Sequence, residues 1–588
     1  MSLRSLFGLA LLNGFVLVVG VSLLYGLRGY RSAVELARLL GLSYLVGLAA
    51  LGVSFTLELV AAVPFSLATI LATGGLLAVA GVALGRALGR PWSLRLGPRP
   101  HLGLVGAIGA ALVVVYLEAL FRAGRLNALS AWDAWAFWVP KAKAIYFFGG
   151  LDEQFFRELP GATYPPIVPA LEATAFHFMG SADVVTLHLQ FWFFLAGFVA
   201  TVAGVLAPCV PELLLWPSLL LVLVAPRVVL RTLDPQADFL LDYFFVAAAL
   251  LVALWLHERE RWQLVSASLF LAAAMLTKRE GQLLAACIVA AALLASGRER
   301  RRAWPPLLAG ALAAGALAVP WRIWFTSRHL QGEFPQIGLL GLFDHRERAL
   351  PALRSVLSTV VDYDLWLIVL PLLGVAMALA FVAGSRLLAS YVGLLVVLMV
   401  AGMTWVLWSF VEFHLPFVQD ERVNPIVRLT ASLVLLAAAL LPLLLQAALS
   451  ARAERLQATV LSSFLPSLRG WRIKPAPPAL LVAVAALAYP LATLAGGSPR
   501  FPATSDCARP ATEKGAIEAV FGSFPSARQA ASLLERAVGA GFRGLVAERN
   551  ACGQVEVVLR GIPTLAVGRE LAQEAQAAGF HVRLEQQG

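Results

Sequence analysis

The stretch that decides the fold is ADFLLDYFFVAAALLVALWL, residues 237–256, in which two acids near the start give way to an unbroken apolar run. A helix of about 20 apolar residues is long enough to cross the roughly 30 Å hydrocarbon core of a bilayer. Strands of a membrane barrel alternate polar and apolar residues instead, so a continuous run excludes a barrel. The stretch therefore predicts a membrane-spanning α-helix.

Comparable runs recur through most of the chain, whose residues are 60% hydrophobic and only 14% charged. Such a composition indicates a protein solvated mostly by lipid. The first run, near residues 6–26, has no convincing cleavage site after it and is expected to stay as a span. About fourteen spans are predicted, with starts near residues 6, 34, 61, 103, 183, 213, 237, 263, 281, 305, 363, 389, 428 and 478.

Basic residues near span ends predict the orientation, because they are retained on the cytoplasmic side of a membrane. The clusters follow the third, ninth and thirteenth predicted spans: Arg86, Arg90, Arg95 and Arg99, then Arg298 and Arg300 to Arg302, then Arg452, Arg455, Arg469, Arg472 and Lys474. All three follow odd-numbered spans, which places the amino terminus and the long segment 125–182 outside. The net charge of +11 is spread over short loops and builds no basic stripe, so no nucleic-acid partner is expected.

The tail beyond residue 499 has ordinary charge density and holds an internal repeat. The segment starting at Val520 aligns without gaps on the one starting at Val558, and each copy is typical of a strand, a Pro turn, an amphipathic helix and a strand. Two such units predict a small α+β domain with a four-stranded sheet and two helices on one face, the ferredoxin-like arrangement. Cys507 and Cys552 of this tail are a candidate disulfide if it lies outside the cytoplasm, with two free thiols as the alternative.

Charged side chains at span ends are the first functional candidates in a membrane protein. Placing a charge there costs free energy, so such a residue is expected to form an ion pair or to have a function. The segment SAWDAWAFWVPKAKA, residues 130–144, places Asp133 beside Trp132 and Trp138, with Lys141 close by. An interfacial helix with an aromatic belt would explain the tryptophans alone. The acid and the lysine favour a functional site.

Further candidates precede other predicted spans. Tyr164-Pro165-Pro166 predicts an extended turn, and Asp238 and Asp242 are spaced to share one helix face. A helix cap explains one acid there but not all of them. The remaining candidates are Lys278, Arg279 and Glu280 in LTKREGQLL, then His414 and Arg428 in the segment EFHLPFVQDERVNPIVRL. Snorkelling and interface anchoring are the alternatives for the basic residues.

The order of these motifs, WDAWAFWVPKAKA, YPPIVPALEA, DPQADFLLDYFF, LTKREG and RVNPIVRL, resembles the bacterial GT-C glycosyltransferases. The resemblance covers roughly residues 103–450 and is greatest to transferases similar to lipopolysaccharide glycosyltransferases, aminoarabinose transferase and protein mannosyltransferases. The family usually has its acidic loop right after the first span, whereas here three further spans precede the loop. The tail, over roughly its last 75 residues, resembles a SPOR domain.

The resemblance implies four parts: N-terminal spans in 1–102, a catalytic core in 103–450, a cytoplasmic loop and last span in 451–499, and the SPOR-like domain in 500–588. It implies a bacterial inner membrane location with the site and the tail outside, a polyprenyl-phosphate-linked sugar as donor, and a glycan, lipid or protein acceptor. Peptidoglycan is a candidate partner of the tail. Membrane lipids surround the spans.

The same resemblance, with the chemistry of such a transfer, suggests a role for each candidate. Asp133 is expected to act as the base, and Asp238 to position the acceptor or a metal. The donor phosphate is assigned to Lys141, Lys278, Arg279 and Arg428, and substrate positioning to Trp132, Trp138, Tyr164, Glu280 and His414. No ligand spacing argues a tight metal site, and a divalent ion stays open.

Three other functions remain alternatives. An O-antigen ligase or polymerase differs mainly in its acceptor. A transporter would be expected to place charges near the middle of the membrane on broken helices, a pattern absent from this sequence. The third alternative is a non-catalytic envelope protein that binds glycan through the tail. That function would assign no role to Asp133 and Asp238.

Overall fold

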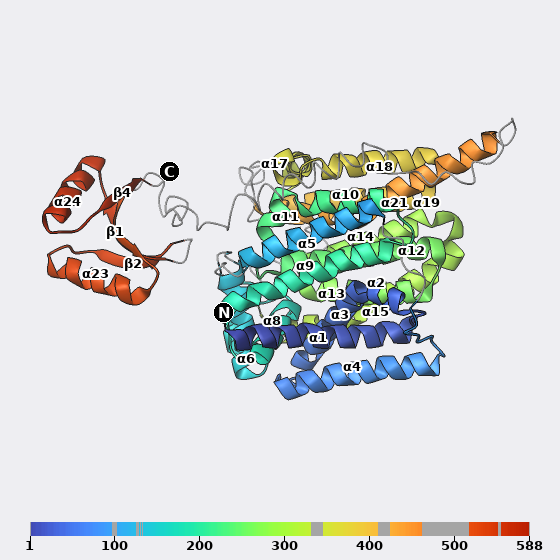
Figure 1. Ribbon diagram of the computed structural model, residues 1–588, viewed down its shortest axis with the longest axis horizontal. Helices are drawn as coiled ribbons and strands as arrows, with labels where there is room; N and C mark the ends of the chain where they lie inside the picture. Colours follow the sequence, from blue (N-terminus) through green and yellow to red (C-terminus); the bar gives the residue numbers. More distant parts are fainter. Residues whose placement is uncertain are drawn as a thin grey trace. The chain divides into compact units, whose positions relative to one another are not determined.

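The computed structural model describes residues 2–96, 103–124, 129, 131, 133–330, 345–409, 424–460, 517–550 and 554–586. The chain divides into two compact units, Met1–Ala492 and Thr493–Gly588. The first is a membrane unit built from helices, and the second is a small α+β unit (Figure 1).

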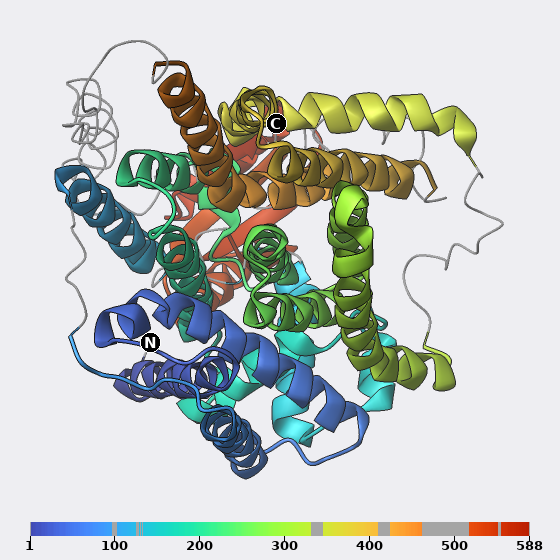
Figure 2. The ribbon, with the colours of Figure 1, turned by 90° about the vertical axis from the view of Figure 1, so that its right-hand side faces the viewer.

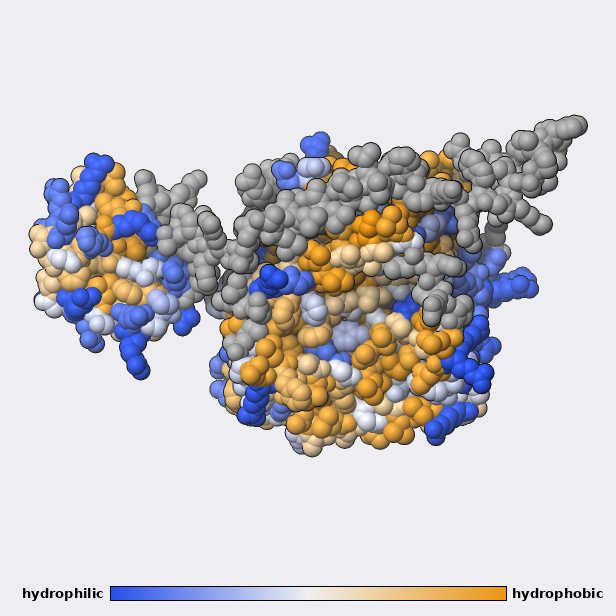
Figure 3. All heavy atoms as spheres, viewed as in Figure 1, coloured by the Kyte–Doolittle hydropathy of each residue, from blue (hydrophilic) through white to orange (hydrophobic). Residues whose placement is uncertain are grey.

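In the described ranges, nine helices are long and apolar enough to cross a membrane, which makes the chain a polytopic α-helical membrane protein. Figure 2 looks along many of these helices nearly end-on, and Figure 3 shows hydrophobic residues over much of the visible face of the membrane unit. The nine are α1 (Leu3–Leu27), α3 (Leu40–Val60), α4 (Leu67–Ala87), α5 (Leu104–Gly124), α9 (Val184–Leu206), α12 (Ala237–Glu258), α15 (Arg300–Ser327), α19 (Arg386–Ser409) and α21 (Asn424–Val460).

The other helices of the membrane unit are shorter. They are α2 (Ala33–Arg38), α6 (Val139–Phe148), α7 (Glu153–Glu158), α8 (Ile167–Met179), α10 (Glu212–Leu223), α11 (Pro226–Arg231), α13 (Arg261–Thr277), α14 (Glu280–Ala295), α16 (Ala349–Val360), α17 (Tyr363–Trp366) and α18 (Val369–Ala383), with the π-helical turn η1 (Ala134–Trp138) and 3₁₀ turns η2 (Gly297–Glu299) and η4 (Arg346–Arg348).

The prediction of about fourteen spans is therefore supported only in part. The runs that start near residues 213, 263, 281 and 363 form α10, α13, α14 and α18, with 12, 17, 16 and 15 residues. Each is shorter than the roughly 20 residues of an ordinary span. Two prolines flank α10, because Pro211 is its N-cap residue and Pro226 is the first residue of the next helix, α11. The run near residue 478 lies outside the described residues.

Residues 125–182 were predicted as one large outer loop, but their described part is mostly helical. It contains η1, α6, α7 and α8, and α8 is buried along most of its length. Helix α8 packs against α1, α3 and α6. The outer segment is therefore a packed layer of the membrane unit.

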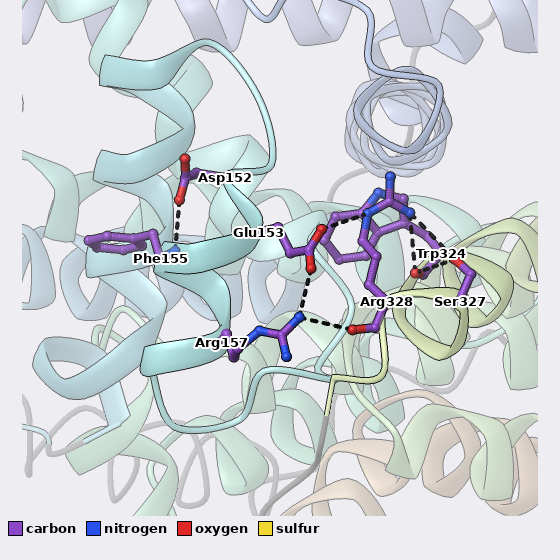
Figure 4. A network of polar contacts seen from close by, with 7 residues as sticks. All are labelled: Asp152, Glu153, Phe155, Arg157, Trp324, Ser327 and Arg328. Atoms are coloured by element: carbon purple, nitrogen blue, oxygen red, sulfur yellow. Dashed lines mark hydrogen bonds and ion pairs between the residues drawn. The ribbon is translucent and has the colours of Figure 1, made fainter.

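A polar network joins α7 to the end of α15 (Figure 4). The Glu153 carboxylate lies 2.6 Å from Arg157 and 3.6 Å from Arg328, and Arg157 donates to the backbone carbonyl of Arg328 at 3.1 Å. The Arg328 guanidinium lies 4.5 Å from the centroid of the Trp324 ring, and Asp152 caps the start of α7. Exposed ion pairs contribute little stability, so this network mainly positions the outer segment.

Glycines allow α1 and α3 to approach closely. A Cβ atom on Gly20 would clash with the backbone carbonyl of Ser43, and one on Gly47 would clash with the carbonyl of Val16. Small residues are common where membrane helices pack, because they bring backbones into contact. Gly14, also on α1, has no atom within 4 Å of such a Cβ.

A buried hydrogen-bond network links α1, α3 and α9. The Asn13 amide donates to Gln190 Oε1 at 2.9 Å, and Asn13 Oδ1 accepts from the Tyr44 hydroxyl at 2.6 Å and from the Gln190 amide at 3.0 Å. All three side chains are buried. The network therefore satisfies polar groups that could not reach water.

We expect Asn13→Ala to lower the free energy of unfolding by about 1–2 kcal/mol, because Tyr44 and Gln190 lose a shared partner inside the bundle. Thermal unfolding in detergent would measure the change. Ser22→Ala is the control, since the Ser22 hydroxyl bonds only to the Val18 carbonyl of its own helix. Equal effects of the two changes would contradict a structural role for the network.

The C-terminal unit contains β1 (Ile517–Phe524), α23 (Ala527–Gly539), β2 (Leu545–Arg549), β3 (Val555–Ile562), α24 (Leu565–Ala577) and β4 (Arg583–Gln586). The strands form one antiparallel sheet in the order β2-β3-β1-β4. Both helices bury alanines, Ala530 and Ala575, in a single core with Phe521 and Val557 of the sheet. The predicted four strands and two helices are confirmed. The likeness to a SPOR domain stays a prediction.

Candidate functional site

The described part of the membrane unit holds a cavity of about 510 Å³ between α12, α14, α19 and α21. Charged side chains and apolar side chains meet there. The lining residues are Tyr164, Asp238, Leu241, Asp242, Lys278, Arg279, Glu280, Gln282, Leu283, Trp405, Val406, Leu407, Arg428, Leu429 and Ser432. The cavity therefore suits a ligand that is charged at one end and apolar at the other.

Arg428 joins two acids that lie far apart in the sequence. Its guanidinium forms an ion pair with Asp133, and its Nε lies 3.7 Å from Asp238 Oδ2. Asp133 and Asp238 are both largely shielded from solvent, with side-chain exposures of 10% and 15%. The structure thus brings Asp133 and Asp238 to one place, as their shared outward placement predicts.

Lys278 makes the second charge contact of the cavity. Its Nζ lies 2.7 Å from Asp238 Oδ1 and 3.1 Å from Glu280 Oε1. Burial alone would lower the pKa of Lys278, but the carboxylates of Asp238 and Glu280 outweigh it and raise the pKa above its ordinary value. Lys278 therefore keeps its positive charge at neutral pH.

Several charged groups of the cavity lie at the N-termini of helices. Asp238 lies in the first turn of α12, and Glu280 is the first residue of α14. Acids are favoured there because the helix dipole is positive at its N-terminus. Asp133 directly precedes η1, and such π-helical turns are rare and occur often at functional sites. Arg428 lies near the start of α21.

The outer segment closes one side of the cavity. Arg279 donates a hydrogen bond to the Thr163 hydroxyl, and its guanidinium lies 5.9 Å from the centroid of the Tyr164 ring. The Trp321 indole of α15 donates to the Thr163 backbone carbonyl at 3.2 Å. These contacts connect the Tyr164-Pro165-Pro166 turn with α14 and α15.

The apolar part of the lining comes mainly from two helices. Trp405, Val406 and Leu407 lie near the end of α19, and Leu429 lies on α21. Leu283 of α14 completes this side and packs against Gly402, where a Cβ atom would lie 2.9 Å from a Leu283 methyl group. An apolar chain could therefore lie beside the charged groups without crossing them.

The structure brings together six of the predicted site residues as cavity lining, namely Tyr164, Asp238, Lys278, Arg279, Glu280 and Arg428. Asp133 joins them through its ion pair with Arg428. Their chemical roles stay predictions.

Lys141 and Trp138 do not line the cavity. Lys141 is fully buried, donates to the Gly161 carbonyl at 2.5 Å, and lies within 5.5 Å of the centroids of the Phe137 and Phe156 rings. Trp138 is also buried and packs on Phe137. These contacts support a role for both in holding η1 and α6. Their predicted phosphate and substrate contacts stay predictions.

Several candidates lie outside the described residues: Trp132, His414, Cys507 and Cys552. Two other cysteines, Cys209 and Cys287, are free thiols.

Asp242 and Ser432 line the cavity although the sequence assigned neither of them a role. The Ser432 hydroxyl donates to Asp242 Oδ1 at 2.5 Å. The spacing of Asp238 and Asp242 indicated a shared helix face, which the cavity confirms. Ser432 carried no signal, because a serine within an apolar run usually bonds to its own helix.

Among the described residues, no group of three or more His, Cys, Asp or Glu side chains could hold a metal ion. Asp238, the predicted metal contact, instead has Lys278 and Arg428 as neighbours. These residues do not fit a divalent ion, and the mechanism proposed below uses only side chains of the chain.

The charged groups of the cavity and the basic clusters lie at opposite ends of the same helices. Helix α14 starts at Glu280 and ends at Ala295, shortly before Arg300. Helix α21 carries Arg428 near its start and Arg452 near its end. The tendency of basic loops to stay in the cytoplasm therefore predicts that the charged groups of the cavity lie at the opposite, extracytoplasmic ends of these helices.

Comparisons with known proteins identify no relative, because no family model, no curated protein and no solved structure matches the chain.

Proposed function

We propose that this protein is an integral membrane glycosyltransferase that moves a sugar from a polyprenyl-phosphate donor to an envelope glycan, lipid or protein acceptor on the extracytoplasmic face. The observation that carries the proposal is the cavity, where Lys278, Arg279 and Arg428 lie beside an apolar side formed mainly by α19. A polyprenyl phosphate has the same two parts, an anionic head and an apolar chain.

The donor phosphate is assigned to three cations of the cavity, Lys278, Arg279 and Arg428. When the sugar is transferred, the bond from its anomeric carbon to the phosphate oxygen breaks, and polyprenyl phosphate leaves with one more negative charge. Cations that are already in place stabilise such a charge as it develops. Arg428 and Arg279 also present planar guanidinium groups that can bind two phosphate oxygens at once.

Asp133 is assigned the role of the general base. An acceptor hydroxyl must lose its proton as its oxygen bonds to the anomeric carbon, and a nearby carboxylate can take that proton. Arg428, which lines the cavity, forms an ion pair with the Asp133 carboxylate. A phosphate that engages Arg428 weakens this ion pair, so that donor binding makes the carboxylate a better proton acceptor. A single displacement of this kind inverts the anomeric configuration.

The direct test uses purified protein, a radiolabelled pool of polyprenyl-phosphate sugars, and envelope extracts as acceptors. We expect label to move from the lipid to an acceptor. Mass spectrometry of the lipids that remain bound after gentle extraction should also detect polyprenyl phosphates. Absence of both transfer and bound polyprenyl phosphate would contradict the proposal.

We expect Lys278→Met to lower the rate of transfer by about 100-fold, because it removes a cation from the phosphate site and leaves Asp238 and Glu280 with less opposing charge. Initial rates at fixed donor concentration would measure the loss. Lys143→Met is the matched control, since Lys143 does not line the cavity. A loss of similar size in the control variant would count against the phosphate role of Lys278.

A further inference from the structure

Two residues of the cavity lining each have a carboxylate oxygen without a hydrogen-bond partner among the described residues. Asp242 is 2% exposed, and its Oδ2 has no hydrogen-bond partner among the described residues, although Ser432 donates to its Oδ1 at 2.5 Å. Glu280 Oε2 is likewise buried without a hydrogen bond in that part of the chain. Both residues line the cavity. Buried acceptors of this kind are rare in folded proteins, so these two indicate a ligand.

The nearby cations do not explain these two oxygens. Lys278 is shared between Asp238 and Glu280 Oε1, and Arg428 is shared between Asp133 and Asp238. Asp242 lies one helical turn deeper than Asp238 on the same face of α12. Asp242 Oδ2 therefore belongs to a residue one turn beyond the ion-paired Asp238, and Glu280 Oε2 lies next to the ion pair with Lys278. Both oxygens need a hydrogen-bond donor.

Only one part of the proposed donor can supply them. Phosphate oxygens are themselves acceptors and carry no hydrogen to donate. The polyprenyl chain has no polar hydrogen. The hydroxyl or amino groups of the sugar are the remaining donors.

We propose that Asp242, together with Glu280, binds the sugar of the lipid-linked donor by accepting hydrogen bonds from its hydroxyl or amino groups. This inference rests on the proposed function and extends it, because it names the residues that recognise the sugar of the donor. Ser432 is a positioning residue, because its hydroxyl fixes Asp242 Oδ1 and leaves Oδ2 directed to the ligand. The phosphate then lies at Lys278 and Arg428, and the sugar lies next to Asp242.

The test compares two constants. The KM for the sugar-bearing donor depends on contacts with its phosphate, its chain and its sugar. Polyprenyl phosphate is the product of the transfer and has no sugar. Its inhibition constant therefore depends only on contacts with the phosphate and the chain. We expect Asp242→Asn to raise the KM about 10-fold or more, because the amide presents a donor where the sugar needs an acceptor. The inhibition constant should stay within about twofold of its wild-type value, because Lys278 and Arg428 of the phosphate site are unchanged.

A second variant and a control complete the design. Ser432→Ala keeps the acid but releases its side chain, and we expect a rise in KM of about threefold at an unchanged inhibition constant. Asp234→Asn makes the same acid-to-amide change outside the cavity lining, where Asp234 pairs with Arg231, and both constants should stay at wild-type values.

Each outcome decides one question. Parallel changes in the two constants, or an unchanged KM in both Asp242→Asn and Ser432→Ala, would overturn the sugar contact while leaving the transferase in place. A wild-type protein that transfers no sugar and is not bound by polyprenyl phosphate would overturn the proposed function itself.

Discussion

Replacing Asp133 with asparagine should lower the turnover of sugar transfer by about 10²- to 10⁴-fold, the usual contribution of a general base. Asparagine keeps the shape of the side chain and can still accept a hydrogen bond from Arg428, the partner of Asp133 in the structure. The KM for the donor should therefore change little. Initial rates over a range of donor concentrations would separate the two constants.

Asp152→Asn is the control for this change. Asp152 is an acid of the same segment, but its carboxylate caps α7 by accepting from the Phe155 N–H, whereas Asp133 forms an ion pair with the cavity residue Arg428. We expect its turnover to match the wild type. Transfer by Asp133→Asn at an undiminished rate would remove Asp133 from the role of base, and another acid of the cavity would then have to be sought.

The second large effect is expected at the contact between α1 and α3. Gly20→Ala adds one methyl group, which would lie against the backbone carbonyl of Ser43. A backbone carbonyl of the neighbouring helix cannot move aside as a side chain can, so the helices must separate. We expect a loss of about 3 kcal/mol in the free energy of unfolding, at the upper end of overpacking effects.

Gly14→Ala makes the identical change on the same helix, where the new methyl group meets no atom within 4 Å. Alanine favours a helix over glycine by about 0.5–1 kcal/mol, so this variant should be equal to or slightly more stable than the wild type. The two substitutions are thus expected to have opposite signs. Thermal unfolding in detergent would measure both, and destabilisation of equal size would contradict the close-packing effect.

The sequence predicted the helical membrane class well, because apolar runs of about 20 residues are typical of membrane-spanning helices. Of the predicted spans, nine are confirmed in the described ranges as helices long enough to cross a membrane, and four form shorter helices, since run length alone does not reveal where a helix ends. Pro211 and Pro226 flank α10, and the two helices on either side of the predicted turn at Lys278 have only 17 and 16 residues. The antiparallel sheet of the tail was predictable because its repeat shows each strand and helix twice.

For the site, sequence could identify charged groups at helix ends but not their partners. The contacts of Arg428 with Asp133 and Asp238 span 295 and 190 positions, and no local pattern encodes such pairs. Lys141 illustrates the converse, since a lysine near an aromatic cluster gives no sign that it is fully buried. The Asp242 and Ser432 pair depends on how α12 and α21 face each other, which only the packing determines.

The ion pair between Arg428 and Asp133 also has a consequence for how the protein is made. Asp133 leaves the ribosome long before Arg428 is synthesised, so its carboxylate must wait through the insertion of α9, α12, α15 and α19 for this partner. A chain that is interrupted before α21 leaves that charge uncompensated. Assembly of the site is therefore one of the last events of biogenesis, and unfinished chains should be inactive and prone to degradation.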